Sequence, residues 1–343
     1  MWLLLAFLSA LFLGFYDVSK KQALKSNAVI PVLFLNTLFC SLIFLPAIIC
    51  SACGWIGESS NFFVPLTTLG EQKYIFLKAC IVLSSWICGY YGMKWLPLTI
   101  VGPINATRPV MVLVGALLVF GERLNIWQWI GVILAIVSFF MLARTGKREG
   151  IDLRHNRWIV LIVLAAILGA VSGLYDKYLM APVESGGVGL NRMAVQSYYN
   201  LYQCFMMGGV LIVERKKKKI KEKNEIKDKS ANLQPSLSLY NNSAQLSSPP
   251  RGELERGLPS ITGGAWGWVF LISLFLSAAD FLYFYSLSLP AALISVVSMI
   301  RRGSVLVSFS VGALFFHEKN LRAKAFDLAL VLLGLFFLWL GSS

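Results

Sequence analysis

The sequence Gly14-Phe15-Tyr16-Asp17 recurs as Gly173-Leu174-Tyr175-Asp176, each time inside a long apolar stretch. The same repetition relates two further sets of polar positions: Asn36 and Cys40 with Asn200 and Cys204, and Pro97 and Arg108 with Pro290 and Arg301. Each half of the chain contains five apolar stretches in the same order. The sequence therefore predicts a duplicated unit of five helices.

The composition indicates a membrane protein. The chain is 57% hydrophobic and only 14% charged, whereas soluble domains carry about 25% charged residues. About 20 apolar residues cross a bilayer as a helix. Stretches of about this length lie at 2–19, 29–50, 74–93, 98–120, 126–142, 158–178, 194–213, 266–286, 291–315 and 325–340.

These stretches predict an all-α membrane protein with ten transmembrane helices. Helices are expected because they satisfy every backbone amide within one segment, and the alternation typical of strands is absent. The first stretch lacks a basic n-region and a cleavage site, so we expect it to be a permanent span. A unit of five spans ends on the opposite side from its start, which predicts two inverted five-helix repeats.

The net charge of +14 follows from the placement of basic residues between the spans. If the N-terminus lies outside, the inner loops hold most of the 31 Lys and Arg residues, including those at 20–25, 144–157, 215–229 and 319–324. The positive-inside rule then predicts both termini outside the plasma (inner) membrane and the basic loops in the cytoplasm. Orientation explains the charge, so no nucleic-acid partner is expected.

The segment 214–265 interrupts the second half. It opens with Arg215-Lys216-Lys217-Lys218-Lys219 and continues with Ser, Asn, Gln and Pro. Such a composition buries too little apolar surface to order itself. We expect a disordered basic cytoplasmic loop, with a regulatory or lipid-binding segment as the alternative.

No metal, cofactor or catalytic site is expected. The six cysteines are scattered, and Cys50-x-x-Cys53 lacks the strand-turn-helix context of a redox motif. His155 and His317 lie in or beside loops. The chain has no His-x-x-x-His, no paired Asp motif and no Gly-x-Ser-x-Gly, which argues against an enzyme.

Ionisable residues inside the predicted spans are candidate functional residues, because buried charge in a membrane usually faces a cavity or a partner. Four of them lie near mid-span: Arg108, Asp280, Arg301 and Arg302. Three lie nearer span ends, where snorkelling toward water is an alternative: Asp17, Asp176 and Lys177.

Spacing around Pro290 predicts an ion pair. Asp280 and Arg301 lie ten residues before and eleven residues after this proline, so both sit about 15 Å from the turn. In the first half, Ile87 takes the place of Asp280. Arg108 is therefore expected to pair with Asp17 or Asp176, or to meet a solute. A pair that only fixes helix register is the alternative for Asp280 and Arg301.

A polar stripe and aromatic clusters complete the candidate site. The stripe runs along one face of the seventh span: Gln196, Tyr199, Asn200 and Gln203. It must face other helices or a wet cavity. Trp86 and Tyr283 belong to matched aromatic clusters of the third and eighth spans, in an interfacial belt or a solute cavity. Tyr16 and Tyr175 lie in the repeated tetrad.

A glutamate precedes the last span of each half. Glu122 and Glu318 lie just after the fourth and ninth spans. Negative charge is favoured at a helix N-terminus, so we expect each to cap the next helix. A role in proton coupling is the alternative.

Apart from the long loop, the chain resembles the drug/metabolite transporter superfamily with two EamA-type repeats. The resemblance rests on five spans per half, a proline before the fourth span and a glutamate before the fifth. It implies a first repeat at 1–145 and a second at 158–343, interrupted at 214–265. Phe15-Tyr16-Asp17-Val18-Ser19-Lys20-Lys21 is also similar to the start of the rhamnose/proton symporter branch.

The resemblance implies a secondary active transporter for a small polar metabolite, such as a sugar, an amino acid, an organic anion or a drug-like solute. Transport would proceed by alternating access and would be coupled to protons or to the exchange of a second solute. Arg108 and Arg301 are the expected solute contacts, and Asp17, Asp176 and Asp280 the candidates for proton coupling. A membrane-embedded enzyme and a non-transporting sensor are the alternatives. The expected partners are the solute and the lipid bilayer, with a homodimer left open.

Overall fold

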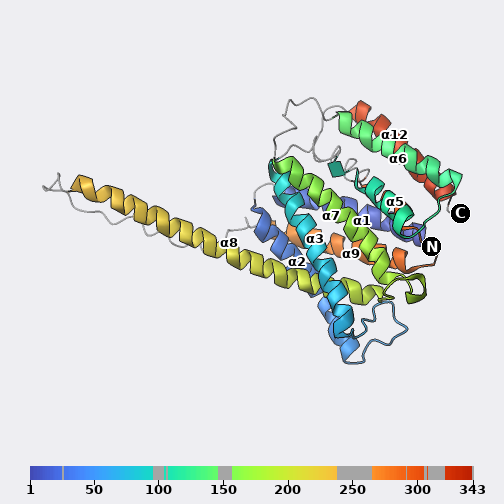
Figure 1. Ribbon diagram of the computed structural model, residues 1–343, viewed down its shortest axis with the longest axis horizontal. Coiled ribbons are helices and arrows are strands. Elements are labelled where there is room, and N and C mark those ends of the chain that lie inside the picture. Colours follow the sequence, from blue (N-terminus) through green and yellow to red (C-terminus); the bar gives the residue numbers. More distant parts are fainter. Residues whose placement is uncertain are drawn as a thin grey trace.

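The computed structural model describes residues 1–24, 27–95, 104–105, 107–145, 157–237, 265–290, 292–304, 307 and 321–341. Within these residues the chain is helical and contains no strand. The helices, labelled as in Figure 1, are α1 (Trp2–Leu24), α2 (Val29–Ala52), α3 (Leu69–Trp95), α5 (Arg108–Val119), α6 (Ile126–Thr145), α7 (Arg157–Met180), α8 (Arg192–Leu237), α9 (Ala265–Ser288), α10 (Ile294–Arg302) and α12 (Leu321–Leu340), with a 3-10 turn at Val183–Ser185. Each predicted span overlaps one of these helices.

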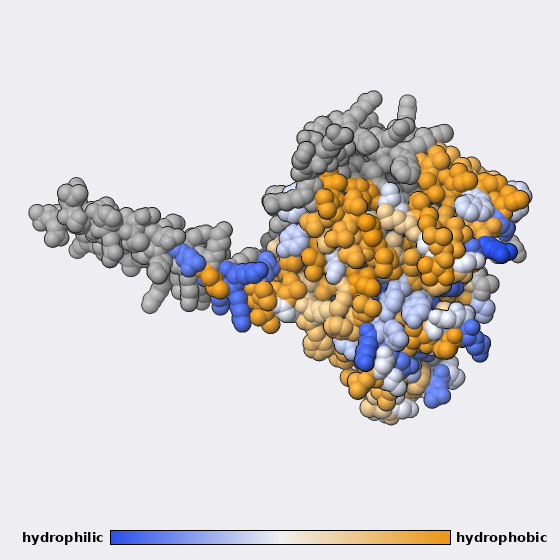
Figure 2. Space-filling view, in the orientation of Figure 1, coloured by the Kyte–Doolittle hydropathy of each residue, from blue (hydrophilic) through white to orange (hydrophobic). Residues whose placement is uncertain are grey.

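Five helices are long and apolar enough to cross a membrane: Trp2–Leu24, Val29–Ala52, Leu69–Gly92, Trp158–Met180 and Trp266–Ser288. They lie side by side with the other helices in one body (Figure 1). Large apolar side chains cover much of the surface of this body (Figure 2), including Leu42, Phe76, Val160, Phe205 and Phe270. Such a surface is expected to face lipid.

The helices pack in pairs that join the two halves of the chain. α1 packs along α9, α3 along α7, and α6 along α12. The Ser9 hydroxyl donates to the Ala279 carbonyl over 2.6 Å between α1 and α9. The Ser85 hydroxyl donates to the Ala165 carbonyl over 2.8 Å between α3 and α7. Further contacts join α2 to α8 and α9, α3 to α8, α5 to α7 and α10, and α1 to α10.

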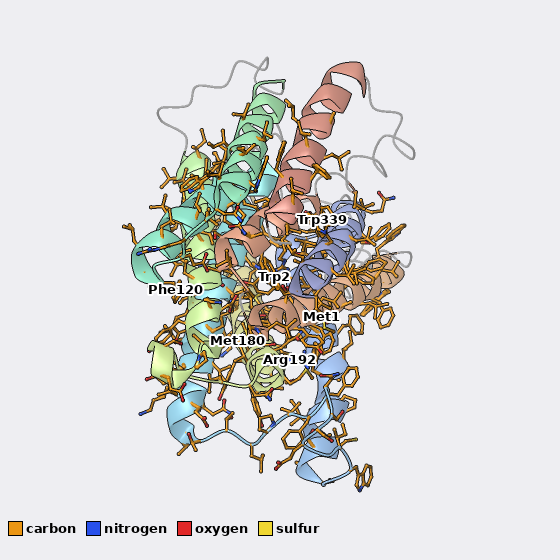
Figure 3. The ribbon with its side chains drawn as sticks, turned by 90° about the vertical axis from the view of Figure 1, so that its right-hand side faces the viewer. Met1, Trp2, Phe120, Met180, Arg192 and Trp339 are labelled. Carbon is orange, nitrogen blue, oxygen red and sulfur yellow. The ribbon has the colours of Figure 1, made fainter. Side chains whose placement is uncertain are left out.

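The two ends of the chain lie near each other. Figure 1 marks both termini at one end of the molecule, and Figure 3 shows Met1 and Trp2 near Trp339. The Ser286 hydroxyl donates to the Trp2 carbonyl over 2.9 Å, which fixes the end of α9 beside the start of α1.

The mid-span arginines lie at helix ends: α5 begins at Arg108, and α10 ends at Arg302. α5 begins at Arg108, with Pro109 in its first turn, where a missing N–H leaves no helical acceptor unpaired. The Thr107 hydroxyl donates to the Ile104 carbonyl over 2.7 Å, so no side chain caps this N-terminus. α10 ends at Arg302, where Gly303 forms a turn.

α8 differs from the expected loop. It has 46 residues and continues to Leu237, far beyond the helical body (Figure 1). Residues 214–237 are therefore helical, while 238–264 lie outside the described residues. Lys, Arg and Glu favour helix, and a helix that is already nucleated extends more easily than a new one forms.

Candidate functional site

A buried ion pair joins α9 and α10. The Arg301 Nη2 lies 2.8 Å from the Asp280 Oδ1, and their side chains are 18% and 13% exposed. The second carboxylate oxygen of Asp280 accepts a hydrogen bond from the Tyr199 hydroxyl of α8 over 2.9 Å. The pairing predicted from the spacing around Pro290 is thus confirmed.

A second ion pair joins α3 and α7. The Lys78 Nζ lies 2.5 Å from the Asp176 Oδ1, and both side chains are 4% exposed. The same ammonium donates to the Ser172 hydroxyl over 2.6 Å. The Asp176 Oδ2 accepts a hydrogen bond from the Tyr283 hydroxyl over 3.2 Å.

Aromatic rings connect the two ion pairs into a closed circuit. The Arg301 guanidinium lies 4.1 Å from the centre of the Tyr283 ring, and the Lys78 Nζ lies 5.9 Å from the centre of the Tyr199 ring. Cations over aromatic faces are attracted to them. We call the resulting set the charged circuit; its six members are Lys78, Asp176, Tyr199, Asp280, Tyr283 and Arg301.

Five helices contribute to the charged circuit: α3, α7, α8, α9 and α10. Asp280 and Tyr283 are three residues apart on α9, so they lie on one helix face. Desolvating an ion pair in a protein interior often offsets its Coulomb attraction. A buried circuit of charges is therefore a weak source of stability, and its position between helices from both halves makes it a functional candidate.

Arg108 has a different environment from Arg301. Its Nη2 donates to the Ala165 carbonyl over 3.0 Å and to the Ser85 hydroxyl over 3.3 Å. Its buried Nε has no hydrogen-bond partner, and no described carboxylate forms an ion pair with it. The expected alternatives Asp17 and Asp176 are thus not brought to Arg108. It lies within electrostatic range of Arg301 and Arg302.

Asp17 and Tyr16 lie at the edge of this region. Asp17 is within electrostatic range of Lys20, Arg301 and Arg302, and it forms no ion pair with any described residue. The Tyr16 and Tyr90 hydroxyls are 3.4 Å apart. The Lys20 Nζ lies 4.3 Å from the centre of the Tyr90 ring.

The polar stripe of α8 faces other helices. Its four predicted residues are all buried. The Gln196 amide donates to the Ser277 carbonyl of α9 over 3.2 Å. Buried polar atoms of Gln196 and Gln203, Oε1 and Nε2 respectively, have no hydrogen-bond partner in the described structure. The Ser41 hydroxyl of α2 donates to the Asn200 carbonyl over 2.8 Å.

Two predicted aromatic residues lie away from the charged circuit. Trp86 packs, partly buried, among apolar residues of α1, α2 and α9. The Tyr175 hydroxyl donates to the Tyr74 carbonyl over 3.3 Å at an exposed position. Tyr283, in contrast, is a member of the circuit.

Glu122 caps a helix of the opposite half. Its carboxylate accepts hydrogen bonds from the backbone N–H of Ile294 over 2.7 Å, the backbone N–H of Ser295 over 3.2 Å and the Ser295 hydroxyl over 2.5 Å. The expectation that Glu122 caps the next helix, α6, is therefore wrong: the carboxylate caps the start of α10, which packs beside the end of α5. Glu318 lies outside the described residues, as do Pro97, His155 and His317.

Lys78 is the member of the site that sequence reasoning missed. It is the single charged residue of the predicted span 74–93, which is a usable signal. Its partner lies 98 positions away in sequence, so only the packing of α3 against α7 reveals the pair.

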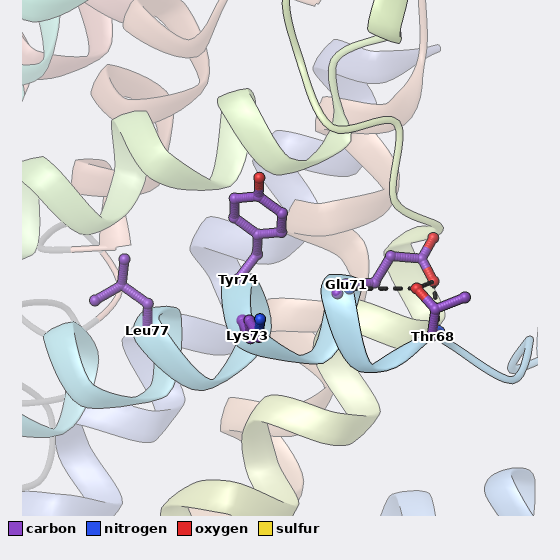
Figure 4. Close-up of a pocket in the computed structure, with 6 residues that line it drawn as sticks. Thr68, Glu71, Lys73, Tyr74 and Leu77 are labelled. Carbon is purple, nitrogen blue, oxygen red and sulfur yellow. Dashed lines mark hydrogen bonds between the residues drawn. The ribbon is translucent and has the colours of Figure 1, made fainter.

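A surface hollow of about 560 Å³ lies at the start of α3 and is lined by Thr68, Gly70, Glu71, Lys73, Tyr74 and Leu77 (Figure 4). Thr68 and Glu71 form a capping box there: the Thr68 N–H donates to the Glu71 Oε2 over 2.6 Å. These hydrogen bonds cap the N-terminus of α3. In the described part of the chain, no group of His, Cys, Asp and Glu could hold a metal ion.

Comparison with known proteins supports a membrane transporter. Residues 1–144 match the EamA-like transporter family. A Sinorhizobium sp relative named "Uncharacterized transporter in cobO 3'region" is 25% identical over 143 residues, which are 41% of this chain and 96% of that relative. A solved crystal structure aligns with 99% of this chain and 98% of its own, with a TM-score of 0.63 and 12% identity. At this identity the likeness concerns the fold alone.

Proposed function

We propose that the chain, whose residues 1–144 match the EamA-like transporter family, is a secondary active carrier. It moves a small polar metabolite with an anionic group across the membrane by alternating access. The observation that carries this proposal is the charged circuit, which joins helices of both halves around buried charges.

Helix packing supports a carrier built from two equivalent halves. Exchanging the halves turns α1 and α9 into α7 and α3, which also pack together. The same exchange turns the contact between α3 and α8 into the one between α9 and α2. Contacts between α2 and α8, and between α6 and α12, map onto themselves. Contacts that are related in this way are expected when a pseudo-two-fold axis relates two inverted five-span repeats.

The neighbouring termini support an even number of spans, because a chain that starts and ends on one side crosses the bilayer an even number of times. We place both termini outside and the basic loops inside. A membrane-impermeant maleimide added to intact cells tests this orientation. It is expected to label Cys53, which is exposed after α2, and to spare a cysteine introduced at Asn224, which is exposed on the extension of α8.

Three guanidinium groups indicate an anionic solute. Arg108, Arg301 and Arg302 lie within electrostatic range of one another. Two carboxylates stand against these three charges: Asp280, which pairs with Arg301, and Asp17, which lies within electrostatic range of Arg302. A carboxylate or phosphate of the solute would neutralise the excess charge and accept charge-assisted hydrogen bonds. The uncapped N-terminus of α5 beside Arg108 would add a favourable dipole.

The ion pair at Arg301 offers a route to coupling. A proton on Asp280 would weaken its bond with Arg301 and free the guanidinium for the solute. Asp17 and Asp176 are the other candidate proton carriers. The buried residues Gln196, Tyr199, Asn200 and Gln203 would supply neutral contacts, together with Tyr16 and Tyr283. Trp86 and Tyr175 are the peripheral candidates.

The experiment is uptake into proteoliposomes by the purified chain, with succinate, inorganic phosphate and glucose as labelled probes and a proton gradient or internal solute as the driving force. Arg108→Ala and Arg301→Ala are expected to abolish uptake of the anion. Arg123→Ala, which removes an exposed arginine, is the matched control and should retain it. Full uptake in both core variants would reject the site, and uptake of glucose alone would reject the anionic class.

A further inference from the structure

The Arg108 guanidinium rests directly on Gly169 of α7. A Cβ atom added at Gly169 would lie 1.9 Å from the Arg108 Nη2, 2.0 Å from its Cζ and 2.3 Å from its Nε. Two atoms that are not bonded cannot approach so closely, so any larger residue at 169 forces the guanidinium to move. The Arg108 side chain is long and flexible, and it can move without disturbing the backbone.

Helix packing alone does not account for this glycine. Small residues four apart let membrane helices approach closely, and α7 carries Ala165, Gly169 and Gly173 at that spacing. A Cβ atom at Gly173 would meet the Val112 Cγ2 only at 3.8 Å and the Tyr283 hydroxyl only at 3.9 Å, both ordinary van der Waals distances. At Gly169 the neighbour is a charged side chain and not helix backbone.

The same turn of α7 also holds the guanidinium through a hydrogen bond. The Ala165 carbonyl accepts from the Arg108 Nη2 over 3.0 Å, one turn before Gly169. Ser85 of α3 accepts from the same nitrogen over 3.3 Å. The Nη2 group is thus engaged by the protein, whereas the buried Nε has no hydrogen-bond partner, as is also true of the Arg301 Nε.

We propose that Gly169 is a positioning residue that leaves room for the Arg108 guanidinium and fixes it for contact with a solute anion, and so determines the affinity of the carrier for anions. This inference rests on the proposed function, because it assigns Arg108 the solute contact. Gly169 itself touches no solute.

The test compares Gly169→Ala with Gly173→Ala in transport. Gly169→Ala is expected to raise the KM for succinate or phosphate about ten- to hundred-fold, the loss expected for a hydrogen bond to a charged group. Its thermal stability should stay close to that of the parent protein, because alanine favours helix. Gly173→Ala should leave KM unchanged. An unchanged KM in Gly169→Ala would overturn the proposal.

A double-mutant cycle separates positioning from packing. In an Arg108→Lys background the narrower ammonium does not overlap a methyl group at position 169. Gly169→Ala should then add less than about a two-fold further loss of transport, since the two changes act through one contact. Additive losses would show that Gly169 acts independently of Arg108 and would contradict the proposal.

A measurement without solute distinguishes failure of this inference from failure of the proposed function. Phenylglyoxal modifies accessible arginines, and mass spectrometry of the Arg108 peptide gives the rate. Gly169→Ala should accelerate modification of Arg108 several-fold while leaving that of Arg301 unchanged, because the displaced guanidinium loses its two acceptors. An unchanged rate at Arg108 overturns the positioning role even if anions are transported. An accelerated rate supports it even if the solute is of another class.

Discussion

Arg108 and Arg301 occupy corresponding positions of the two halves, yet only one of them is neutralised. Arg301 forms an ion pair with Asp280 and lies over the Tyr283 ring. Arg108 donates to a hydroxyl and a carbonyl. The comparison teaches that duplication of a fold can preserve the place of a charge while changing what balances it. The unbalanced arginine is the better candidate for meeting a charged solute.

The largest change in stability is expected at the Lys78–Asp176 ion pair. Arg108, in contrast, forms no ion pair with a described carboxylate. Lys78→Met leaves a buried carboxylate unpaired and should lower the free energy of unfolding by about 3–5 kcal/mol. Thermal unfolding in detergent measures this loss. Lys73→Met, on the exposed first turns of the same helix, is the control and should change it by less than about 0.5 kcal/mol. Equal losses in both variants would contradict a buried pair.

Giving Arg108 a carboxylate partner should remove the difference between the two arginines. Ser85→Asp places a carboxylate next to the Arg108 Nη2, whose present hydroxyl partner is 3.3 Å away. Uptake of the anionic probe should fall about 100-fold, equivalent to about 2.7 kcal/mol, with the fold retained. Ser85→Ala is the control, with most of the uptake kept. Normal uptake in Ser85→Asp would show that Arg108 need not be free.

The two arginines should also differ in their contribution to stability. Arg301→Ala leaves Asp280 buried with only Tyr199 as a partner and should cost about 3 kcal/mol. Arg108→Ala removes hydrogen bonds to neutral acceptors and should cost about 1–2 kcal/mol. The difference between their unfolding free energies, about 1–2 kcal/mol, is the measured quantity. A reversed order would mean that Arg108 has an undetected charged partner.

The smallest effect is expected at the cap of the helix that carries Arg301. Glu122→Gln weakens three hydrogen bonds at the start of α10 and should cost about 1 kcal/mol. Glu71→Gln, in the exposed capping box of α3, should cost about 0.5 kcal/mol. Thermal unfolding of both variants checks this order, and no loss in Glu122→Gln would argue against a cap across the halves.

Hydropathy and local spacing were sufficient for much of the fold. Apolar stretches of spanning length predict helices because lipid permits little else, and the spacing around Pro290 correctly pairs Asp280 with Arg301. Contacts between helices far apart in sequence could not be predicted from hydropathy and local spacing. The partner of Lys78 and the helix capped by Glu122 depend on which helices pack together, and no local pattern encodes that choice. The extension of α8 was missed because a polar composition was read as disorder although its residues favour helix.

Because α8 is long, a small tilt of this helix within the helical body produces a large displacement at its far end. One continuous helix carries Tyr199, which donates a hydrogen bond to Asp280, and runs to Leu237. The part beyond Val213 measures about 36 Å, so a tilt of about 5° displaces its tip by about 3 Å. A pair of spectroscopic labels, one at that tip and one on the helical body, would therefore follow each rearrangement around Asp280 as a readable change in distance.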